Sequence, residues 1–375
     1  MTDQKIIDSA VEHFRQLLIS QIARAEGMKD APAPDKKDSV VIGLAGGDGI
    51  GPIIMAEARK ALECLLKDEI AAGKVCLKEI PGLTIENRLA LGKPIPDEAM
   101  EAIRQCDVLL KGPTTTPSGG TMESANVALR RELDLYANVR PVAVPDEGID
   151  WTFFRENTEG EYTLGSKGIA LDGLLAMDFK VTTVEGTRRI ARAAYEFARK
   201  NGKTHVAIVT KSNIMKKTDG LFSAICHEIA AEYPGITTDE YYIDIMTANL
   251  INPAIRKNFQ VFLLPNLYGD IITDEAAQIQ GGVGTAGSAN VGDRCAMFEA
   301  IHGSAPRLIA EGLGDRANPE SILRAAVMLL RHIGLSAKAD RLSAAIDKAA
   351  LTCPVTGTRE GNTCRAFGDA VTAAL

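Results

Sequence analysis

The sequence has few features of secreted or membrane proteins. Its seven cysteines are scattered over 375 residues and form no C-x-x-C pair, so we expect free thiols rather than a disulfide framework or a zinc site. No uninterrupted apolar run approaches the roughly 20 residues of a membrane span. The N-terminal acids Asp3, Asp8 and Glu12 fit neither a signal peptide nor a transit peptide. We therefore expect a cytoplasmic protein with no membrane partner.

Excess positive charge is also absent. There are 42 Lys and Arg against 49 Asp and Glu, a net charge of −7. This balance argues against nucleic acid as the main partner, which would favour a basic face. With 46% apolar and 24% charged residues, the composition is that of a globular protein, and the length suggests two domains.

The first 38 residues form an appendage to the rest of the chain. Apolar residues at helical spacing predict an amphipathic helix over 5–25, and the polar, Pro-containing stretch 30–38 predicts a linker. We expect this segment either to contact a partner subunit or to cover the surface of its own chain.

Strands and helices alternate from residue 40 onwards. Such alternation predicts an α/β protein with a largely parallel sheet, whose ligands gather at the carboxyl ends of the strands. The expected strands are 40–45, 107–110, 205–210 and 260–264. The expected helices are one after Pro52, 127–135, 188–199 and one opened by Asn318-Pro319-Glu320, with Pro319 at its first position.

Two glycine-rich segments have different contexts. The segment 46–52, GGDGIGP, lies between a strand and a helix, where it fits a tight turn and a close approach to a ligand equally well. The segment 282–287 reads G-x-G-x-x-G but follows a helical stretch. Without a preceding strand it is not a Rossmann fingerprint, and we expect a flexible loop there.

A hydroxyl-rich loop precedes a group of arginines. The loop 111–120 follows a strand, and Ser124, Asn126 and Arg130 come after it at spacings that place them on one face of a helix. Arg140 and Arg155 add two guanidinium groups. Because arginine binds carboxylates bidentately, this group in an acidic protein favours a polycarboxylate ligand.

Two carboxylates follow the strand at 260–264. Asp270 and Asp274 are four residues apart, on one face of a helix, where they would repel each other unless a cation lay between them. Oxygen ligands of this kind suit Mg²⁺ or Mn²⁺, whereas a helix-capping role would explain Asp270 alone. Lys211 stands at a strand end, where it is either a solvated cation or an acid/base group. His302 is the only histidine in a Gly-containing loop.

Taken together, the segments resemble the β-decarboxylating dehydrogenase family, which includes isocitrate, homoisocitrate and 3-isopropylmalate dehydrogenases. The resemblance covers roughly residues 40–375. It rests on GGDGIGP at 46–52, KGPTTTP at 111–117, RRELDLYANVRPV at 130–142, RENTEGEY at 155–162, NLYGDIITD at 266–274 and IHGSAP at 301–306 with Ala317-Asn-Pro319.

The resemblance implies a fold distinct from the standard Rossmann fold. It consists of a large discontinuous α/β domain, 39–137 with 281–375, and a smaller α/β domain, 138–280, after the extension 1–38. The segment 163–179 resembles the part that clasps a second subunit. A homodimer or higher homo-oligomer with shared active sites is therefore implied.

The resemblance also implies roles for single residues. Those that would hold the substrate carboxylates are Ser124, Asn126, Arg130, Arg140, Arg155 and Asn213. The metal ligands would be Asp270 and Asp274 with Asp244 of the neighbouring subunit, and the acid/base pair would be Tyr162 and the neighbour's Lys211. Those that would line the nicotinamide coenzyme are Thr115, Thr116, Glu299, His302, Gly303, Ser304, Ala305, Pro306, Arg307 and Asn318.

Within the family, Ser124 and Asn126 beside Arg130 favour isocitrate. Their hydroxyl and amide can bind a third carboxylate, whereas 3-isopropylmalate needs an apolar surface; homoisocitrate, one methylene longer, differs by only about 1–3 kcal/mol. For the coenzyme, Arg307 stands where NAD enzymes of the family carry an acid, yet the tail 355–361 lacks the Tyr and Arg of the NADP enzymes. We expect NAD, with NADP as the alternative. A non-catalytic regulatory subunit of the same fold is a further alternative, which the presence of Tyr162 and Lys211 disfavours.

Overall fold

The chain forms two compact units. A computed structural model describes residues 4–28, 38–117, 122–165, 167–171 and 173–375. The terminal unit comprises Pro34–Val144 and Asp274–Leu375, and the central unit comprises Met1–Ala33 and Pro145–Thr273. The domain borders expected from the sequence, after residues 137 and 280, fall at the first residue of β4 (Ala137–Val144) and the last residue of α10 (Asn266–Gln280).

A six-stranded mixed sheet forms the terminal unit. Its strands, in spatial order, are β2 (Val75–Glu79), β1 (Val40–Ala45), β3 (Val108–Lys111), β12 (Ala296–Ala300), β11 (Gly287–Val291) and β4. The pairs from β2 to β12 are parallel, whereas β11 is antiparallel to both of its neighbours. A short turn joins β11 to β12, with the Gly292 amide donating to the Cys295 carbonyl at 3.0 Å, and so short a connection permits only antiparallel pairing.

Helices cover both faces of this sheet. One core contains side chains of β1, β3 and β12 together with Ile54, Leu62, Leu329 and Ile346 from α2, α12 and α13. On the other face, Ile103 and Leu129 from α5 and α6 lie in a core with Leu109 of β3. The helices of the unit are α2 (Gly51–Leu65), α3 (Lys67–Ala71), α4 (Ile85–Leu91), α5 (Asp97–Arg104), α6 (Ala125–Glu132), α11 (Pro306–Ala310), α12 (Glu320–His332), α13 (Ser336–Thr352) and α14 (Cys364–Ala374), with short 3₁₀ turns η4 (Val283–Thr285) and η5 (Gly314–Arg316).

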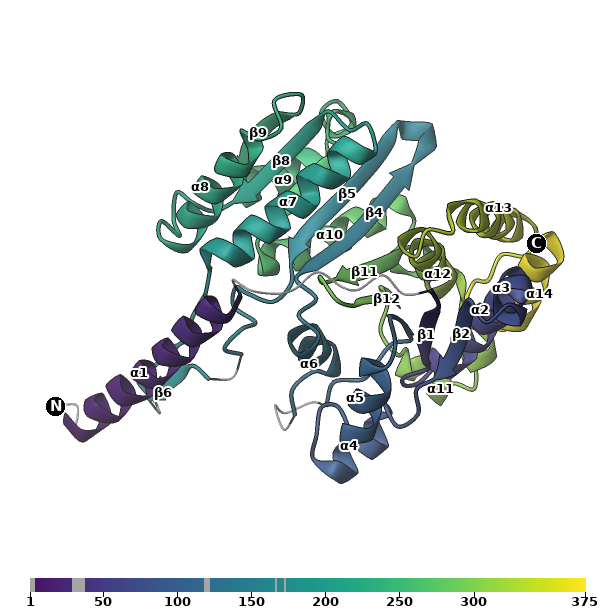
Figure 1. The fold of residues 1–375 in the computed structure, drawn as a ribbon, viewed down its shortest axis with the longest axis horizontal. Coiled ribbons are helices and arrows are strands. Elements are labelled where there is room, and N and C mark those ends of the chain that lie inside the picture. The colour runs from purple at the N-terminus through teal and green to yellow at the C-terminus, as the bar shows by residue number, and fades with distance from the viewer. Residues whose placement is uncertain (1–3, 29–37, 118–121, 166, 172) are drawn as a thin grey trace. The chain divides into compact units, whose positions relative to one another are not determined.

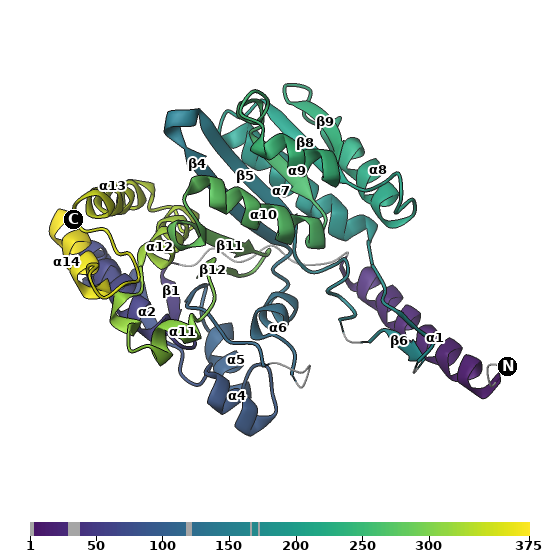
Figure 2. The ribbon, with the colours of Figure 1, turned by 180° about the vertical axis from the view of Figure 1, so that it is seen from behind.

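The central unit is built on a fully parallel sheet. Its strands, in spatial order, are β5 (Ile149–Glu156), β10 (Val261–Leu264), β8 (His205–Thr210) and β9 (Thr237–Tyr242). The helices α7 (Val184–Lys200) and α8 (Thr218–Ala230) lie on the face seen in Figure 1, and α9 (Ile243–Ile251) lies on the face seen in Figure 2. Trp151, Phe153 and Phe262 are fully buried in this sheet. Short 3₁₀ turns, η2 (Pro145–Glu147) and η3 (Arg256–Asn258), complete the unit.

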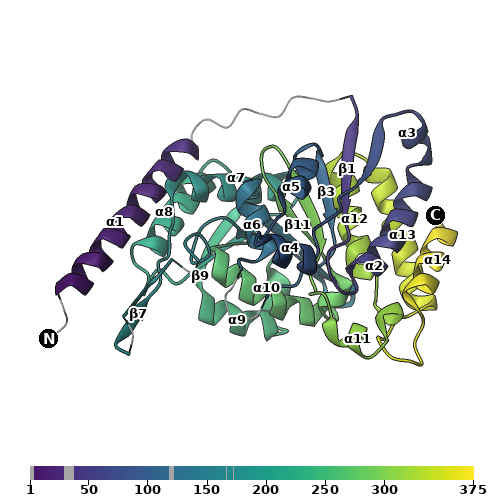
Figure 3. The same cartoon turned by 90° about the horizontal axis from the view of Figure 1, so that it is seen from below.

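The N-terminal helix belongs to the central unit. Helix α1 (Gln4–Gly27) confirms the predicted amphipathic helix. It runs beside the arm that carries the antiparallel hairpin of β6 (Ile169–Leu171) and β7 (Leu175–Met177) (Figure 3). The rings of Phe14 and Phe179 lie 5.3 Å apart, and Leu17 is buried. Seven large apolar side chains of α1 nevertheless stay exposed: Ile6, Ile7, Val11, Phe14, Leu18, Ile19 and Ile22.

The α/β class is confirmed, and the predicted elements differ from the observed ones at a few points. Helix α12 begins at Glu320, with Pro319 just outside it, because the Asn318 side chain accepts the Glu320 amide at 3.0 Å. The segment 282–287 is a 3₁₀ turn leading into β11 rather than an irregular loop. The predicted linker 30–38 lies outside the described residues except for its last position. In the described residues, no helix is long and apolar enough to cross a membrane.

Core packing gives a first prediction. Leu62 of α2 is fully buried, whereas Leu351 of α13 is 86% exposed. Leu62→Ala should lower the free energy of unfolding by about 2–5 kcal/mol because it leaves a cavity. Leu351→Ala, the matched control, should change it by less than about 0.5 kcal/mol. Urea unfolding curves at one protein concentration measure both, and equal losses would contradict the assigned burial.

Candidate functional site

Three loops of the terminal unit are tied together by a buried carboxylate. Asp48, in the glycine-rich segment after β1, accepts the Thr115 amide at 2.7 Å and the Ile85 amide at 2.6 Å. It also pairs with the fully buried Arg88 at 2.9 Å, and Arg88 donates to the Thr115 carbonyl at 2.7 Å. The Thr115 and Ser304 hydroxyls lie 2.7 Å apart. Asp48 therefore fixes the 111–117 loop, and Thr115 connects it to the 301–306 loop.

Glycine is required where these loops meet. A Cβ on Gly47, which has φ of 74°, would lie 2.2 Å from the Pro113 carbonyl oxygen. A Cβ on Gly49, with φ of 58°, would lie 2.1 Å from the Ser304 carbonyl oxygen. Both the conformation and the clearance exclude a side chain. The segment 46–52 is therefore a tight turn, and the close approach that its glycines permit is to the neighbouring loops at Pro113 and Ser304.

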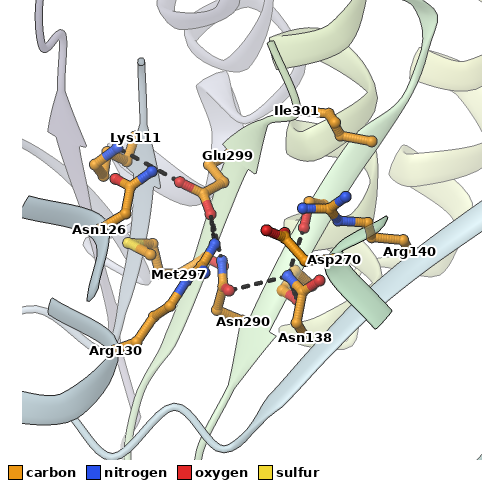
Figure 4. A network of polar contacts seen from close by, with 12 residues as sticks. Lys111, Asn126, Arg130, Asn138, Arg140, Asp270, Asn290, Met297, Glu299 and Ile301 are labelled. Carbon is orange, nitrogen blue, oxygen red and sulfur yellow. Dashed lines mark hydrogen bonds and ion pairs between the residues drawn. The ribbon is translucent and has the colours of Figure 1, made fainter. Parts of the chain in front are cut away.

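A second buried carboxylate, Glu299 on β12, binds two cations (Figure 4). Lys111 Nζ lies 3.4 Å and Arg130 Nη2 lies 3.1 Å from its oxygens. The Asn290 amide donates to Glu299 at 2.8 Å, and Asn138 donates to Asn290 at 3.0 Å. Strands β3, β4, β11 and β12 and helix α6 therefore contribute to one polar network.

The two cations keep Glu299 ionised. Burial alone would raise the pKa of Glu299, but Lys111 and Arg130 lower it to about 2. Burial also lowers the pKa of Lys111, against the attraction of Glu299. One carboxylate thus faces two cations in this network.

Helix α6 places the other expected substrate-binding residues. Ser124 precedes its first turn without capping it, and Asn126 accepts a hydrogen bond from the Thr114 hydroxyl at 3.0 Å. Arg130 leaves the end of the same helix towards Glu299. The structure therefore brings Asn126 to the 111–117 loop and Arg130 to the Glu299 network. Thr116 is exposed in that loop.

Each of the two remaining arginines binds an aspartate of α10. Arg140, at the centre of β4, donates to Asp274 at 3.1 Å. Arg155, at the end of β5, forms an ion pair with Asp270 and donates to the Asn266 side-chain oxygen at 2.9 and 2.6 Å. All three predicted substrate arginines thus already bind a protein carboxylate.

Tyr162 joins the Arg155 group. Its hydroxyl donates to Asp270 at 2.8 Å, and the Arg155 guanidinium lies 5.3 Å from the centre of its ring. The central unit therefore contains Arg155, Tyr162 and Asp270 in mutual contact. A phenol hydrogen-bonded to a carboxylate beside a guanidinium is a suitable proton donor.

Lys211 and Asp244 form a separate pair. Lys211 follows β8, and its Nζ lies 2.7 Å from Asp244 on α9. A hydrogen bond from Lys211 lowers the pKa of Asp244. The backbone of Lys211 is held by the fully buried Asp219, which accepts its amide at 2.7 Å. Asn213 is exposed two residues further on.

The loop after β12 carries the expected coenzyme contacts. Ala305 has φ of 47° and immediately precedes α11, which Pro306 opens; a non-glycine residue in this conformation is uncommon and marks a constrained loop. Burial lowers the pKa of His302, whose Nδ1 lies 3.0 Å from the Gly303 carbonyl. Arg307 is 84% exposed and pairs with Glu311 at 3.5 Å.

The carboxylates of α10 fit a hard divalent cation. Asp270 and Asp274 lie one turn apart, with side chains 42% and 65% exposed, so their oxygens are accessible. Within the described residues no three His, Cys, Asp or Glu side chains form a metal-binding group. Asp244 pairs with Lys211.

Three residues that order the site could not be identified from sequence patterns. Asp48 and Lys111 lie within the motifs at 46–52 and 111–117, but a glycine-rich pattern does not predict that a charged residue in it forms a buried ion pair. Arg88 lies in a helix remote from every motif and carries no signal in the sequence. Of the free cysteines, Cys106 and Cys226 are buried, whereas Cys64 on α2 is exposed.

Comparisons with known proteins identify relatives of the same family as the resemblance suggested. A family model described as isocitrate/isopropylmalate dehydrogenase matches residues 41–371. A probable mitochondrial NAD isocitrate dehydrogenase subunit alpha of Caenorhabditis elegans is 37% identical over 335 residues, 86% of this chain and 89% of that protein. An NADP isocitrate dehydrogenase of Rickettsia prowazekii is 40% identical over 78% of this chain, which spans 59% of that relative. The crystal structure of isocitrate dehydrogenase from Methylococcus capsulatus matches with a TM-score of 0.79 and 34% identity, over 89% of this chain and 99% of that one.

The Glu299 network gives a second prediction. Glu299→Gln would leave Lys111 and Arg130 with less compensation and should lower the free energy of unfolding by about 3–5 kcal/mol. Glu311→Gln, which breaks only the exposed pair with Arg307, should cost less than about 1 kcal/mol.

The same variant should change the pH dependence. Because the folded pKa of Glu299 is depressed from 4.5 to about 2, its contribution to stability is present above about pH 4.5 and is lost as the pH falls towards 2. Glu299→Gln should flatten the stability curve in that window. A slope equal to that of the wild type would show that Glu299 is not the group responsible.

Proposed function

The chain belongs to the isocitrate/isopropylmalate dehydrogenase family, and we propose that within it the protein is an NAD-dependent isocitrate dehydrogenase. It would oxidise isocitrate and release CO₂ to form 2-oxoglutarate, with Mg²⁺ or Mn²⁺ as the metal. The observation that carries the proposal is the set of Arg130, Arg140 and Arg155, each bound to a protein carboxylate. Three guanidinium groups match a ligand with three carboxylates.

Substrate binding would exchange the aspartate partners of Arg140 and Arg155 for substrate carboxylates. The substrate carboxylates would bind to the arginines, and Ser124, Asn126 and Asn213 would add neutral hydrogen bonds. The aspartates released by Arg140 and Arg155 are Asp274 and Asp270, which are the proposed metal ligands. Charge compensation is thus preserved on both sides of the exchange, which limits the desolvation cost that unpaired charges would impose.

Asp270, Asp274 and a second subunit's Asp244 would hold the metal. When bound, the metal polarises oxygens of the substrate and favours the loss of the hydroxyl proton. The exposure of both aspartates on α10 supports this assignment. Without a cation, two carboxylates one helical turn apart depend on arginine to offset their repulsion.

Proton transfer would use two residues, Lys211 and Tyr162. Lys211 of a second subunit would take the hydroxyl proton, and the nicotinamide coenzyme, when bound, would supply the acceptor for the carbon-bound hydrogen. The bond to the adjacent carboxylate then breaks, CO₂ leaves with the electron pair remaining on carbon, and Tyr162 would protonate that carbon. The hydrogen bond from Tyr162 to Asp270 supports this role, since Asp270 is one of the proposed metal ligands. Because Lys211 and Asp244 would act in a neighbouring subunit, these roles require a homodimer or a higher homo-oligomer. The cytoplasmic location stays a prediction.

The coenzyme would lie along the loops fixed by Asp48. Thr115, Thr116, Glu299, His302–Arg307 and Asn318 would contact it. The relatives include proteins named for NAD and for NADP. The exposed guanidinium of Arg307 pairs with the carboxylate of Glu311. Because an anion already binds this arginine, the pair favours NAD over NADP, which carries an additional 2′-phosphate.

The substrate is tested by comparing kcat/KM for isocitrate, homoisocitrate and 3-isopropylmalate with the purified protein. Isocitrate should be preferred, because the hydroxyl of Ser124 and the amide of Asn126 would bind a carboxylate and not an isopropyl group. Turnover should vanish with a chelator and return with Mg²⁺ or Mn²⁺. A preference for 3-isopropylmalate would overturn the proposal, and no turnover of any of the three would favour a regulatory subunit.

Arg307→Ala tests the coenzyme. If the protein uses NAD, this variant should change the KM for NAD by less than about twofold, because the side chain is exposed. Loss of a charged contact to a 2′-phosphate would instead raise the KM for NADP by at least about tenfold. A wild-type kcat/KM for NADP above that for NAD would reverse our choice.

A further inference from the structure

We propose that Arg24, on the N-terminal helix, is a positioning residue for the segment that carries Arg155 and Tyr162. The inference rests on the proposed function for the roles of those two residues. The family model begins at residue 41, so the helix that holds Arg24 is an addition to the matched region. Its contacts give the appendage a specific task in the central unit.

Arg24 binds the middle of that segment. Its guanidinium lies 3.3 Å from Glu159 and donates to the Thr158 carbonyl at 3.1 Å. Arg189 of α7 donates to the Thr158 hydroxyl at 3.1 Å. Two arginines from different helices therefore hold residues 158 and 159, between Arg155 and Tyr162.

The residues held by Arg24 are connected directly to the site. Glu159 is buried, and its carbonyl accepts a hydrogen bond from the Asn266 side chain at 2.9 Å. The oxygen of that same side chain accepts two hydrogen bonds from Arg155. A displacement of Glu159 would therefore change the position of Asn266, and with it the guanidinium of Arg155.

The segment needs an external cation because it contains two buried acids. Glu156 accepts the amides of Thr158 and Glu159 at 2.9 and 2.6 Å. Burial, and then the nearby charge of Glu159, raise the pKa of Glu156 to about 7. Glu159 also accepts the Thr183 amide at the start of α7. Arg24 offsets this negative charge from a helix outside the segment.

Simple surface packing does not account for this contact. Arg15, on the same helix, is 64% exposed and pairs with Glu12 of its own helix. The Arg24 side chain is 24% exposed and reaches a carboxylate that is 3% exposed. Charged hydrogen bonds to buried groups contribute more than exposed pairs do, so the two arginines form a matched comparison.

Kinetics of the full-length Arg24→Ala, Arg24→Lys and Arg15→Ala variants test the inference. Arg24→Ala should raise the KM for isocitrate about tenfold, the scale expected when a charged hydrogen bond is lost, with the KM for coenzyme unchanged. Arg24→Lys should restore part of the loss, because an ammonium keeps the charge but not the fork. Arg15→Ala should match the wild type. A fall in kcat with an unchanged KM for isocitrate would indicate a smaller folded fraction and would overturn the inference.

Hydrogen exchange supplies a readout that needs no substrate. Amides over residues 156–163 should exchange faster in Arg24→Ala than in Arg15→Ala, with the core strand β10 unchanged in both. Equal exchange in that segment would overturn the inference. If wild-type protein fails to turn over isocitrate, the proposed function fails while this comparison still decides whether Arg24 holds the segment. Should Arg24→Ala fail to fold, Arg24→Lys provides the same comparison.

Discussion

The pairing of buried carboxylates with guanidinium or ammonium groups is the constraint on which the described structure depends. Asp48 with Arg88, and Glu299 with Lys111 and Arg130, are almost fully removed from water. Separating either pair would leave a buried charge uncompensated, which is far more costly than never burying it. The loops and strands around them are consequently fixed in position by electrostatics as well as by apolar packing.

The partly exposed pairs follow a different logic. Arg140 with Asp274 and Arg155 with Asp270 combine a buried guanidinium with an aspartate that remains accessible. Such pairs can exchange partners at modest cost, because the incoming groups have the same charge and geometry. The terminal unit thus contains the rigid pairs that define its scaffold, and each unit contains one exchangeable pair suited to a ligand.

Much of the local architecture could be predicted from the sequence. The strand at 205–210 and the helix containing 5–25 follow from residue patterns, and the position of Asp270 and Asp274 on one helix after a strand follows from their spacing. The antiparallel strand β11 could not, because its direction depends on a short turn to β12 rather than on its own residues. The positions of Arg88 and Arg24 could not be predicted either, since each binds a carboxylate distant in sequence and no local pattern identifies such a partner.

The row of exposed apolar side chains on α1 makes any association through this helix depend on temperature and on the kind of salt. Ile7, Val11, Leu18 and Ile22 are among the exposed apolar side chains of this helix, and hydration of such surface carries a large heat capacity. Any association that covers the row will weaken on cooling and strengthen in sulfate, the opposite of what salt does to ion pairs. Cold, low-salt buffer is therefore the condition in which this helix is most fully hydrated.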